Sequence, residues 1–463
     1  MSQARIMIAG TGSGCGKTTV TCALMKAFTD AGERVVPFKC GPDYIDPMFH
    51  AHVTGQASSN LDSFFLDQKG LKGLMQERLQ EGTLGIVEGV MGFFDGQGTG
   101  THASSFEVAC LTGTPVILVV DAKGMSLSLI ALLEGFQNFA QKAGGEGCIK
   151  GVILNRCKAS TCAYLKPVIQ EQTGFKVYGY LEENPRWSLE SRHLGLITAQ
   201  EVRDLDERIA RLGSEARTSF DLEAIRRTAS QAPSLQEETL HSILESASVG
   251  GDAVLDQGSI SDRTLRLAVA KDAAFCFYYR ENLKLLETLG VQLIYFSPLK
   301  EHLPPEIDGL YLGGGYPELY AQELSQNQTL RKEIRQKCRE GLPVLAECGG
   351  YLYLQEALEG FPMVGFLSGS ARMTSRLGHF GYVFIQAEKG GLFGDKGFSF
   401  RGHEFHYSET SHEGGDLCVQ KQDGRSWKDG IYTNTLYAAY PHLYFYSNIE
   451  AVTDFIRTMG GNR

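Results

Sequence analysis

The chain has 463 residues, of which 43% are hydrophobic, and a formal net charge of −10. This length exceeds the usual size of one domain, so we expect two. Its 44 basic residues are outnumbered by 54 acidic ones and form no basic run, which argues against nucleic acid or an anionic membrane as a partner.

No apolar stretch is long enough to span a bilayer. The first residues, MSQARIMIAGTG, run straight into a predicted strand and a glycine-rich loop rather than forming a signal peptide. We therefore expect a soluble, cytoplasmic protein. Its eleven cysteines are scattered without CxxC spacing, so most are expected to be reduced, buried side chains.

The first half of the chain alternates short apolar runs with helical segments, which is typical of a parallel α/β sheet covered by helices on both faces. Helices are predicted at about 17–31, after a glycine-rich loop, and at 126–142, where leucines recur at helical spacing. The predicted strands are Arg5–Ala9, Arg34–Phe38, Leu84–Glu88, Pro115–Asp121 and Gly151–Asn155.

The pattern weakens between about residues 228 and 263, where a polar stretch predicts a linker around a short helix. Apolar runs then return as LRLAVA, VQLIYF, IDGLYLGG and LPVLAE, with a helix predicted at about 279–289. We therefore expect a first domain at 1–245, a linker at 246–263 and a second α/β domain at 264–450.

A glycine-rich loop, GTGSGCGKTT, lies between the first strand and the first helix. Its backbone N–H groups and the helix amino terminus would face phosphate oxygens, Lys17 would reach the terminal phosphates, and Thr18 would bind Mg²⁺. Thr11 replaces the first glycine of the strict P-loop pattern, a variant that resembles the dethiobiotin-synthetase group. The alternative is a glycine-rich turn with an incidental lysine. The predicted nucleotide-binding residues are Gly14, Gly16, Lys17, Thr18 and Thr19.

Acidic residues follow the second and third predicted strands, in the segments KCGPDYIDP and VEGVMGFFDG. Carboxylates that face ATP phosphates need Mg²⁺ between them, so Thr18, Asp43 and Glu88 are assigned to the metal. Asp46 and Asp95 are placed nearer a second substrate, although aspartates beside proline and glycine are often only turn residues.

The segment GVILN ends in Asn155, which we assign to the adenine edge. The alternative is that Asn155 is only a turn residue, because asparagine often follows a strand.

The segment LPVLAECGGYLYL predicts a strand, a tight turn and a helix, with Cys348 at the turn. Small neighbours permit the sharp bend that exposes a nucleophile, and the helix amino terminus is expected to lower the pKa of the thiol. The N–H groups of Gly349 and Gly314, the latter in GGGYPE, are the predicted oxyanion donors. The alternative is a buried, inert cysteine.

A cysteine nucleophile needs a base, and we assign His442, in AAYPHLYF, to this role. His403 and His406, in RGHEFHYS, are competitors, and this pair also has an alternative as metal ligands for which no third partner is evident. Taken alone, His442 would more often be a structural or surface residue.

In chain order these motifs resemble the cobyrinic acid a,c-diamide synthases (the CbiA type), a family of glutamine-dependent tetrapyrrole amidases. The resemblance covers nearly the whole chain and rests on GTxSGxGKT, KxGPDYIDP, VEGVMGxxDG, GGGYPE, ECGGYxYL, GHEFHYS and a final histidine.

The resemblance implies a synthetase domain joined to a class I glutamine amidotransferase domain, with Mg²⁺, ATP and glutamine. It implies that Cys348 is the glutaminase nucleophile, that His442 activates it, and that two carboxylates of a tetrapyrrole are amidated in turn. Typical class I enzymes carry a glutamate two residues after the histidine, where this chain has Tyr444. The family that the chain resembles lacks this glutamate too and usually has a second histidine there, so the resemblance implies a Cys–His dyad.

Several alternatives stay open. The tetrapyrrole could be sirohydrochlorin, its nickel derivative or siroheme, because motifs around ATP and glutamine do not separate these substrates. A P-loop switch or metallochaperone with an inactive glutaminase domain is an alternative of another class. Cobyric acid synthase and CTP synthase fit less well. We expect no nucleic acid and no membrane as partners, and a homodimer is possible.

Overall fold

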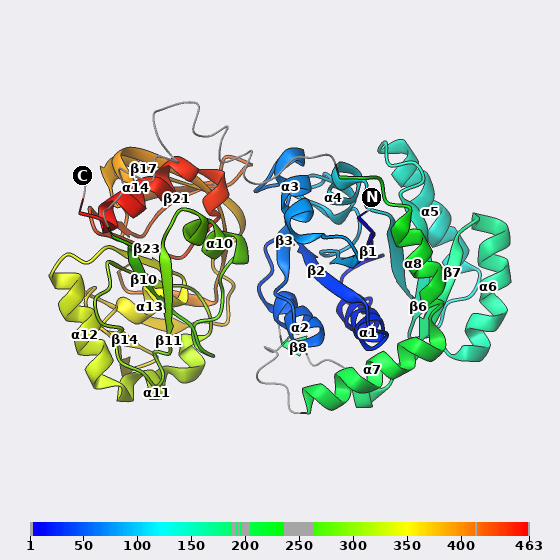
Figure 1. Ribbon diagram of the computed structural model, residues 1–463, viewed down its shortest axis with the longest axis horizontal. Helices are drawn as coiled ribbons and strands as arrows, with labels where there is room; N and C mark the ends of the chain where they lie inside the picture. Colours follow the sequence, from blue (N-terminus) through cyan, green and yellow to red (C-terminus); the bar gives the residue numbers. More distant parts are fainter. Residues whose placement is uncertain are drawn as a thin grey trace. The chain divides into compact units, whose positions relative to one another are not determined.

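The structure is a computed structural model that describes residues 3–187, 191–192, 195–196, 204–235, 263–412 and 414–461. The chain divides into two compact units, Met1–Ile243 and Leu244–Arg463 (Figure 1). Apart from Arg263, the linker expected at 246–263 lies outside the described residues. No helix in the described ranges is both long and apolar enough to cross a membrane.

The N-terminal unit is built on a seven-stranded parallel sheet with the order β3-β2-β4-β1-β5-β6-β7. All five strands predicted in this unit are confirmed, whereas β3 and β7 were not predicted. The strands are β1 Arg5–Gly10, β2 Arg34–Cys40, β3 Ser59–Leu61, β4 Thr83–Glu88, β5 Val116–Asp121, β6 Ile149–Asn155 and β7 Lys176–Leu181.

Right-handed crossovers place α1 and α2 on one face of this sheet and α3 to α6 on the other, and α7 packs against α1. The apolar side chains between the strands and α1, α7 and α8 form one buried core. The helices are α1 Lys17–Asp30, α2 Ile45–Thr54, α3 Gln68–Arg78, α4 Ser105–Thr112, α5 Ser128–Lys142, α6 Ala159–Thr173, α7 Leu205–Ser219 and α8 Leu222–Ser230.

The strand order of this sheet reverses at the carboxyl end of β1. The chain leaves β1 toward β2 on one side and later crosses from β4 to β5 on the other. Ligands of open parallel sheets bind where the strand order reverses in this way. The loops that follow β1, β2 and β4 carry the predicted nucleotide and carboxylate residues, so the topology brings them together.

The C-terminal unit has a six-stranded sheet with the order β11-β10-β12-β13-β23-β22, parallel except for its edge strand β22. The three helices between residues 321 and 354 pack on a second apolar core. The strands are β10 Arg266–Ala270, β11 Gln292–Phe296, β12 Gly309–Leu312, β13 Val344–Glu347, β22 Ile431–Tyr432 and β23 Leu436–Ala439, and the helices are α10 Arg280–Thr288, α11 Ala321–Gln326, α12 Gln328–Arg339, α13 Gly349–Leu354 and α14 Ile449–Met459.

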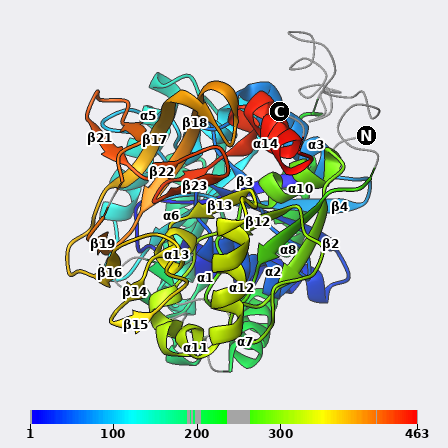
Figure 2. The ribbon, with the colours of Figure 1, turned by 90° about the vertical axis from the view of Figure 1, so that its left-hand side faces the viewer.

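An antiparallel sheet of order β21-β20-β17-β18-β24 covers part of this unit, and α14 packs against β18 (Figure 2). This sheet was not predicted from the sequence. Its strands are β17 Phe380–Gly391, β18 Gly394–Phe405, β20 Leu417–Gln420, β21 Ser426–Asp429 and β24 His442–Leu443. A further small sheet contains β14 Ala357–Leu358, β15 Phe361–Pro362, β16 Ser370–Met373 and β19 Ser408–Thr410.

Candidate functional sites

The glycine-rich loop after β1 has the backbone shape of a phosphate-binding loop. Gly14 and Gly16 have φ angles of 75° and 91°, in the left-handed region that glycine adopts without strain. Gly16 is also the N-cap of α1, and a Cβ there would stand 2.0 Å from Nδ2 of Asn155. Only glycine fits this position. The loop leads directly into a 14-residue helix, whose free N–H groups at the amino terminus are suited to bind phosphate oxygens.

The side chains that begin α1 lie as the sequence predicts. Lys17 is buried, and its Nζ donates to the carbonyl of Gly12 at 3.2 Å, so the ammonium lies over the loop. Burial lowers its pKa from the ordinary lysine value. The Thr18 hydroxyl donates to Glu88 at 2.6 Å. Thr19 is half-buried in the first turn of α1.

Asn155 holds the phosphate loop. Its Nδ2 donates to the carbonyl of Cys15 at 2.8 Å, and the side chain is 6% exposed. Its neighbour Arg156, which was not predicted, donates to the carbonyl of Gly14 at 3.1 Å and to Asp121 at 2.6 Å. These two residues connect the carboxyl end of β6 to the phosphate loop by hydrogen bonds. The assignment of Asn155 to the adenine edge stays a prediction.

A buried lysine, which the sequence analysis did not single out, organises the acidic residues. Nζ of Lys39 lies 2.6 Å from Asp46, 3.4 Å from Glu88 and 3.9 Å from Asp43. It also donates to the carbonyl of Gly89 at 3.0 Å. We call Lys39, Asp43, Asp46, His50 and Glu88 the Lys39 cluster. The structure thus brings together three of the four predicted acids.

The loop that carries Asp43 is fixed by its own hydrogen bonds. Oδ1 of Asp43 accepts from the N–H of Ile45 at 2.8 Å and of Asp46 at 3.3 Å, at the start of α2. Asn60 donates to the carbonyls of Gly41 and Asp43, both at 2.8 Å. Asp43 therefore forms a turn, as the alternative interpretation required, and still faces Lys39.

Glu88 is the most constrained acid of the Lys39 cluster. It is fully buried and accepts from Thr18 at 2.6 Å, while its other oxygen lies 2.6 Å from Nε2 of His50. Burial alone would raise the pKa of Glu88, but Lys39, His50 and Thr18 outweigh it and hold this pKa well below the ordinary value. Glu88 is therefore a charged carboxylate beside the phosphate loop.

Asp46 has the opposite electrostatic setting. Burial, together with the neighbouring charges of Asp43 and Glu88, raises its pKa well above the ordinary value, although Lys39 opposes the shift. Three carboxylates share the one ammonium of Lys39, which is why the proton of Asp46 is held more tightly than on an isolated aspartate.

The donors beside the phosphate loop fit Mg²⁺ in chemistry, because a hydroxyl and carboxylates are hard oxygen ligands and Mg²⁺ bound with ATP needs few protein ligands. Thr18 and Glu88 are already in contact, with Asp43 across Lys39. Within the described ranges, however, no three His, Cys, Asp or Glu residues are grouped as a self-sufficient metal site. The assignment of Thr18, Asp43 and Glu88 to a metal stays a prediction.

Asp95 lies near the phosphate loop, because a Cβ on Gly92 would meet both its Oδ2, at 2.3 Å, and Cα of Gly12, at 3.4 Å. It is exposed after β4, and its Oδ2 accepts from the N–H of Gly92 at 2.9 Å, which closes a turn. This contact corresponds to the turn-forming alternative. A substrate role for Asp95 stays a prediction.

In the C-terminal unit, Cys348 occupies a strained turn between β13 and α13. Its φ and ψ angles are 46° and −104°, which a residue with a side chain rarely adopts. Its N–H donates to the carbonyl of Ala439 on β23 at 2.8 Å, and its carbonyl accepts from Leu352 at 3.0 Å. This is the geometry of a nucleophile elbow.

The expected lowering of the pKa of Cys348 is wrong. The thiol is 8% exposed, and burial raises its pKa, as do the carboxylates of Glu318, Glu404 and Glu347. The N–H of Gly349 favours the thiolate but is outweighed. Since α13 has only six residues, its dipole is weak, and the thiol needs a base to ionise.

His442 lies beside the nucleophile, on the short strand β24. A Cβ on Gly314 would stand 2.3 Å from Cε1 of His442, 2.9 Å from its Nε2 and 3.4 Å from Cβ of Cys348. The histidine and the cysteine thus flank the same glycine, and no larger residue fits between them. His442 is 3% exposed, and its Nδ1 lies 3.6 Å from Oε2 of Glu347.

The two predicted oxyanion donors lie at this elbow. The N–H of Gly349 acts on the thiol of Cys348 in the direction that lowers its pKa. The carbonyl of Gly314 accepts from Cys276 and Phe277, both at 3.0 Å, which fixes this glycine beneath His442. Their role as oxyanion donors stays a prediction.

The competing histidines have other surroundings. His406 contacts the buried Glu404 at 2.9 Å and stacks on Tyr440 with a ring separation of 3.6 Å. His403 pairs across strands with His442, and burial, with the nearby charges of His442 and Lys421, lowers its pKa to about 3. His403 therefore stays neutral near pH 7. Neither histidine belongs to a metal-binding group within the described ranges.

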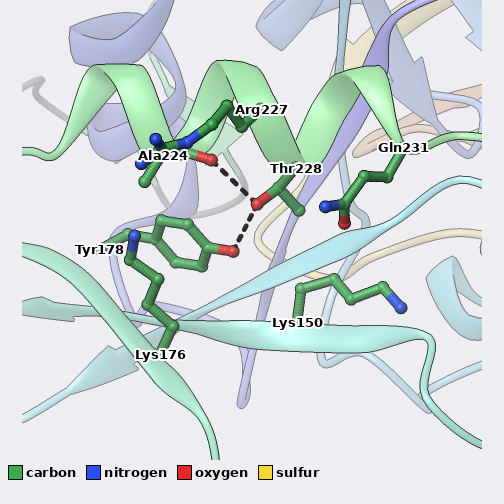
Figure 3. A pocket seen from close by; sticks show the side chains of 7 residues that line it. All are labelled: Lys150, Lys176, Tyr178, Ala224, Arg227, Thr228 and Gln231. Atoms are coloured by element: carbon green, nitrogen blue, oxygen red, sulfur yellow. Dashed lines mark hydrogen bonds between the residues drawn. The ribbon is translucent and has the colours of Figure 1, made fainter.

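A separate pocket of about 320 Å³ lies at the amino ends of the strands of the N-terminal sheet (Figure 3). Lys150 and Lys176 line it near the amino ends of β6 and β7, whereas the phosphate loop lies at the carboxyl ends. Lys176 is paired with Asp221 at 3.1 Å, and Arg227 with Glu223 at 3.1 Å. Its cations are therefore partly compensated, and it is no part of the sites above.

Two family models match the chain, one in each unit. Residues 6–197 match the CobQ/CobB/MinD/ParA nucleotide binding domain, and residues 266–449 match the CobB/CobQ-like glutamine amidotransferase domain. The matches agree with the predicted pair of a P-loop domain and a glutamine amidotransferase domain.

Curated relatives match over nearly the full length. A cobyrinate a,c-diamide synthase of Listeria innocua is 40% identical over 456 residues, which cover 96% of this chain and 97% of the relative. A cobyrinate a,c-diamide synthase of Streptococcus sanguinis is 39% identical over 465 residues, which cover 98% of each chain.

Proposed function

This chain belongs to the family of cobyrinate a,c-diamide synthases, which are glutamine-dependent ligases, and from that premise we propose that it amidates the a and c carboxylates of cobyrinic acid with ATP and glutamine. The observation that carries the proposal is that one chain has both a P-loop beside a carboxylate cluster and a Cys348–His442 elbow. A ligase of this type needs both sites, one to activate the acid and one to release ammonia.

In the glutaminase half-reaction, the Cys348 sulfur attacks the amide carbon of glutamine while His442 takes the thiol proton. The proton then passes to the leaving nitrogen, which departs as ammonia, and a thioester remains. Water hydrolyses the thioester and releases glutamate. In this proposal the N–H groups of Gly349 and Gly314 stabilise the oxyanion of the tetrahedral intermediate.

In the synthetase half-reaction, the substrate carboxylate attacks the γ-phosphorus of ATP, giving an acyl phosphate and ADP. Ammonia then attacks the acyl carbon, and phosphate leaves. The loop glycines and Lys17 orient the phosphates, and Lys39 holds Asp46 and Glu88 in place. Bound at Thr18, Glu88 and Asp43, Mg²⁺ would neutralise phosphate charge during transfer.

Mass spectrometry after incubation with Mg-ATP, glutamine and either cobyrinic acid or sirohydrochlorin tests the substrate. Two carboxylate-to-amide conversions on cobyrinic acid alone are expected. Conversion of sirohydrochlorin alone would refute the proposed substrate and leave the reaction type standing. If neither is amidated while glutamine is hydrolysed, the tetrapyrrole assignment is wrong.

The variant Cys348→Ser tests the division of labour between the sites. It is expected to be inactive with glutamine and active with ammonium salts, because the synthetase half-reaction needs only ammonia. Loss of both activities would contradict two separable sites. A P-loop switch with an inactive glutaminase would show no glutamine hydrolysis in the wild-type chain, even with tetrapyrrole and ATP present.

A further inference from the structure

We propose that Glu347, the residue directly before the nucleophile, is the acidic positioning residue of His442. The inference rests on the proposed glutaminase role of Cys348 and His442. It assigns the third member of the site to the nucleophile's own strand, β13, rather than to the segment that follows the histidine.

Both carboxylate oxygens of Glu347 face the strand that carries His442. Oε2 lies 3.6 Å from Nδ1 of the imidazole, which is longer than a hydrogen bond and becomes an ion pair only when the histidine carries a second proton. Oε1 accepts from the N–H of Leu443 at 2.9 Å. Glu347 is 1% exposed, so water screens this contact little.

The carboxylate is held where it is by neutral donors. The hydroxyl of Tyr311 on β12 donates to Oε2 at 2.8 Å. Asn282 holds the same segment from the other side, because its Nδ2 donates to the carbonyl of Leu443 at 2.7 Å and its Oδ1 accepts from Phe445 at 2.8 Å. Among these contacts, only His442 can become a cation and compensate the buried charge of Glu347.

The residue two positions after the histidine cannot take this role. Tyr444 stands where typical class I enzymes carry a glutamate, and it is 1% exposed. Its ring packs edge-on against Tyr279, with a centroid separation of 5.4 Å. An acid that serves His442 must therefore come from elsewhere, and Glu347 is already in place.

The arrangement places acid, imidazole and thiol in a productive order. Nδ1 of His442 faces Glu347, while Nε2 lies near Gly314 and Cys348. When the thiol proton moves to Nε2, Glu347 stabilises the imidazolium through Nδ1 and stays ionised. The same proton leaves Nε2 for the departing nitrogen, so Glu347 gains and loses no proton in the cycle.

The test is the variant Glu347→Gln, which keeps the shape and the acceptor for Leu443 but removes the charge. Glutamine hydrolysis by the full chain should fall by about 100-fold in kcat with little change in KM, because an opposite charge at this range alters the proton affinity of an imidazole by roughly 10- to 1,000-fold. Alkylation of Cys348 by iodoacetamide should slow in parallel.

Tyr311→Phe is the matched control, because it removes a hydrogen bond from the same carboxylate and leaves its charge. It should lose no more than about threefold in kcat by the same reasoning. Ammonium-dependent amidation and the thermal midpoint serve as checks of folding in both variants.

The proposal is overturned if Glu347→Gln retains its kcat, or if Tyr311→Phe loses as much as Glu347→Gln, which would indicate a scaffold role. The hydrolysis rate, the alkylation rate and the thermal midpoint are all measured without a tetrapyrrole, so a wrong substrate assignment leaves the test intact. If the wild-type chain hydrolyses no glutamine, the alkylation rates decide, and equal rates in wild type and Glu347→Gln overturn the proposal.

Discussion

Replacing Gly314 by alanine should slow glutamine use strongly while leaving the rest of the protein folded. The added Cβ would stand 2.3 Å from Cε1 of His442, a distance that non-bonded carbons do not reach. The imidazole must therefore retreat by about 1 Å, and a misplacement of that size costs roughly 100-fold in rate. This corresponds to about 3 kcal/mol of lost transition-state stabilisation.

The assay compares three activities of Gly314→Ala with those of wild type. Glutamine hydrolysis should fall by about 100-fold, whereas ammonium-dependent amidation should be unchanged. The free energy of unfolding, measured in urea, should fall by about 1–3 kcal/mol because the added methyl group overpacks the site. Gly135→Ala is the control, because its Cβ meets nothing within 4 Å and its position in α5 favours alanine by about 1 kcal/mol.

The reasoning fails if Gly314→Ala hydrolyses glutamine at more than half the wild-type rate. Such a result would mean that the space between His442 and Cys348 is not where the reaction needs these two side chains. Equal losses of glutamine-dependent and ammonium-dependent activity would also contradict it, because the synthetase site would then have been disturbed.

Other perturbations test the remaining parts of the two sites. Asn155→Ala removes the hydrogen bond to Cys15, so KM for ATP should rise about 10-fold, which corresponds to a loss of about 1.4 kcal/mol in ATP binding. An unchanged KM would show that the phosphate loop keeps its conformation without this bond. Glu88→Gln breaks a buried charge network, so ATP-dependent amidation should be lost and the free energy of unfolding, measured in urea, should fall by about 3–5 kcal/mol. An unchanged free energy of unfolding would contradict the network. The pKa of His403 is about 3 in the folded protein, so between about pH 6.5 and pH 3 only the unfolded chain binds this proton, and the free energy of unfolding falls by up to about 1.4 kcal/mol per pH unit. His403→Gln should reduce the difference in the free energy of unfolding between pH 7 and pH 5, measured by urea titration. An equal difference in the variant and the wild type would refute the buried neutral state.

The sequence predicted those features that depend on short segments. The glycine pattern ending at Lys17 specifies a loop and a helix start, because both need particular backbone angles within ten residues. The elbow at Cys348 was predicted for the same reason, from a strand, small residues and a helix in succession. Its strained φ angle of 46° agrees with that interpretation.

Contacts between distant segments were not predictable from one sequence. Lys39 lies within the quoted motif KCGPDYIDP, but its pairing with Glu88 depends on the register of β2 and β4. The contact between Glu347 and His442 likewise depends on strands far apart in the chain. The pKa of Cys348 was mispredicted because the local rule considered the helix start and omitted burial and distant carboxylates.

The long separation between Cys348 and His442 has a consequence for synthesis on the ribosome. All seven strands of the N-terminal sheet lie between Arg5 and Leu181, so this unit can fold while later residues are still being added. The cysteine then precedes its base by more than 90 residues, a delay of roughly 5–20 s at ordinary elongation rates. During that interval the nascent chain carries a weakly acidic thiol without a base. Ammonia release therefore begins only after the unit proposed to consume ammonia has been made.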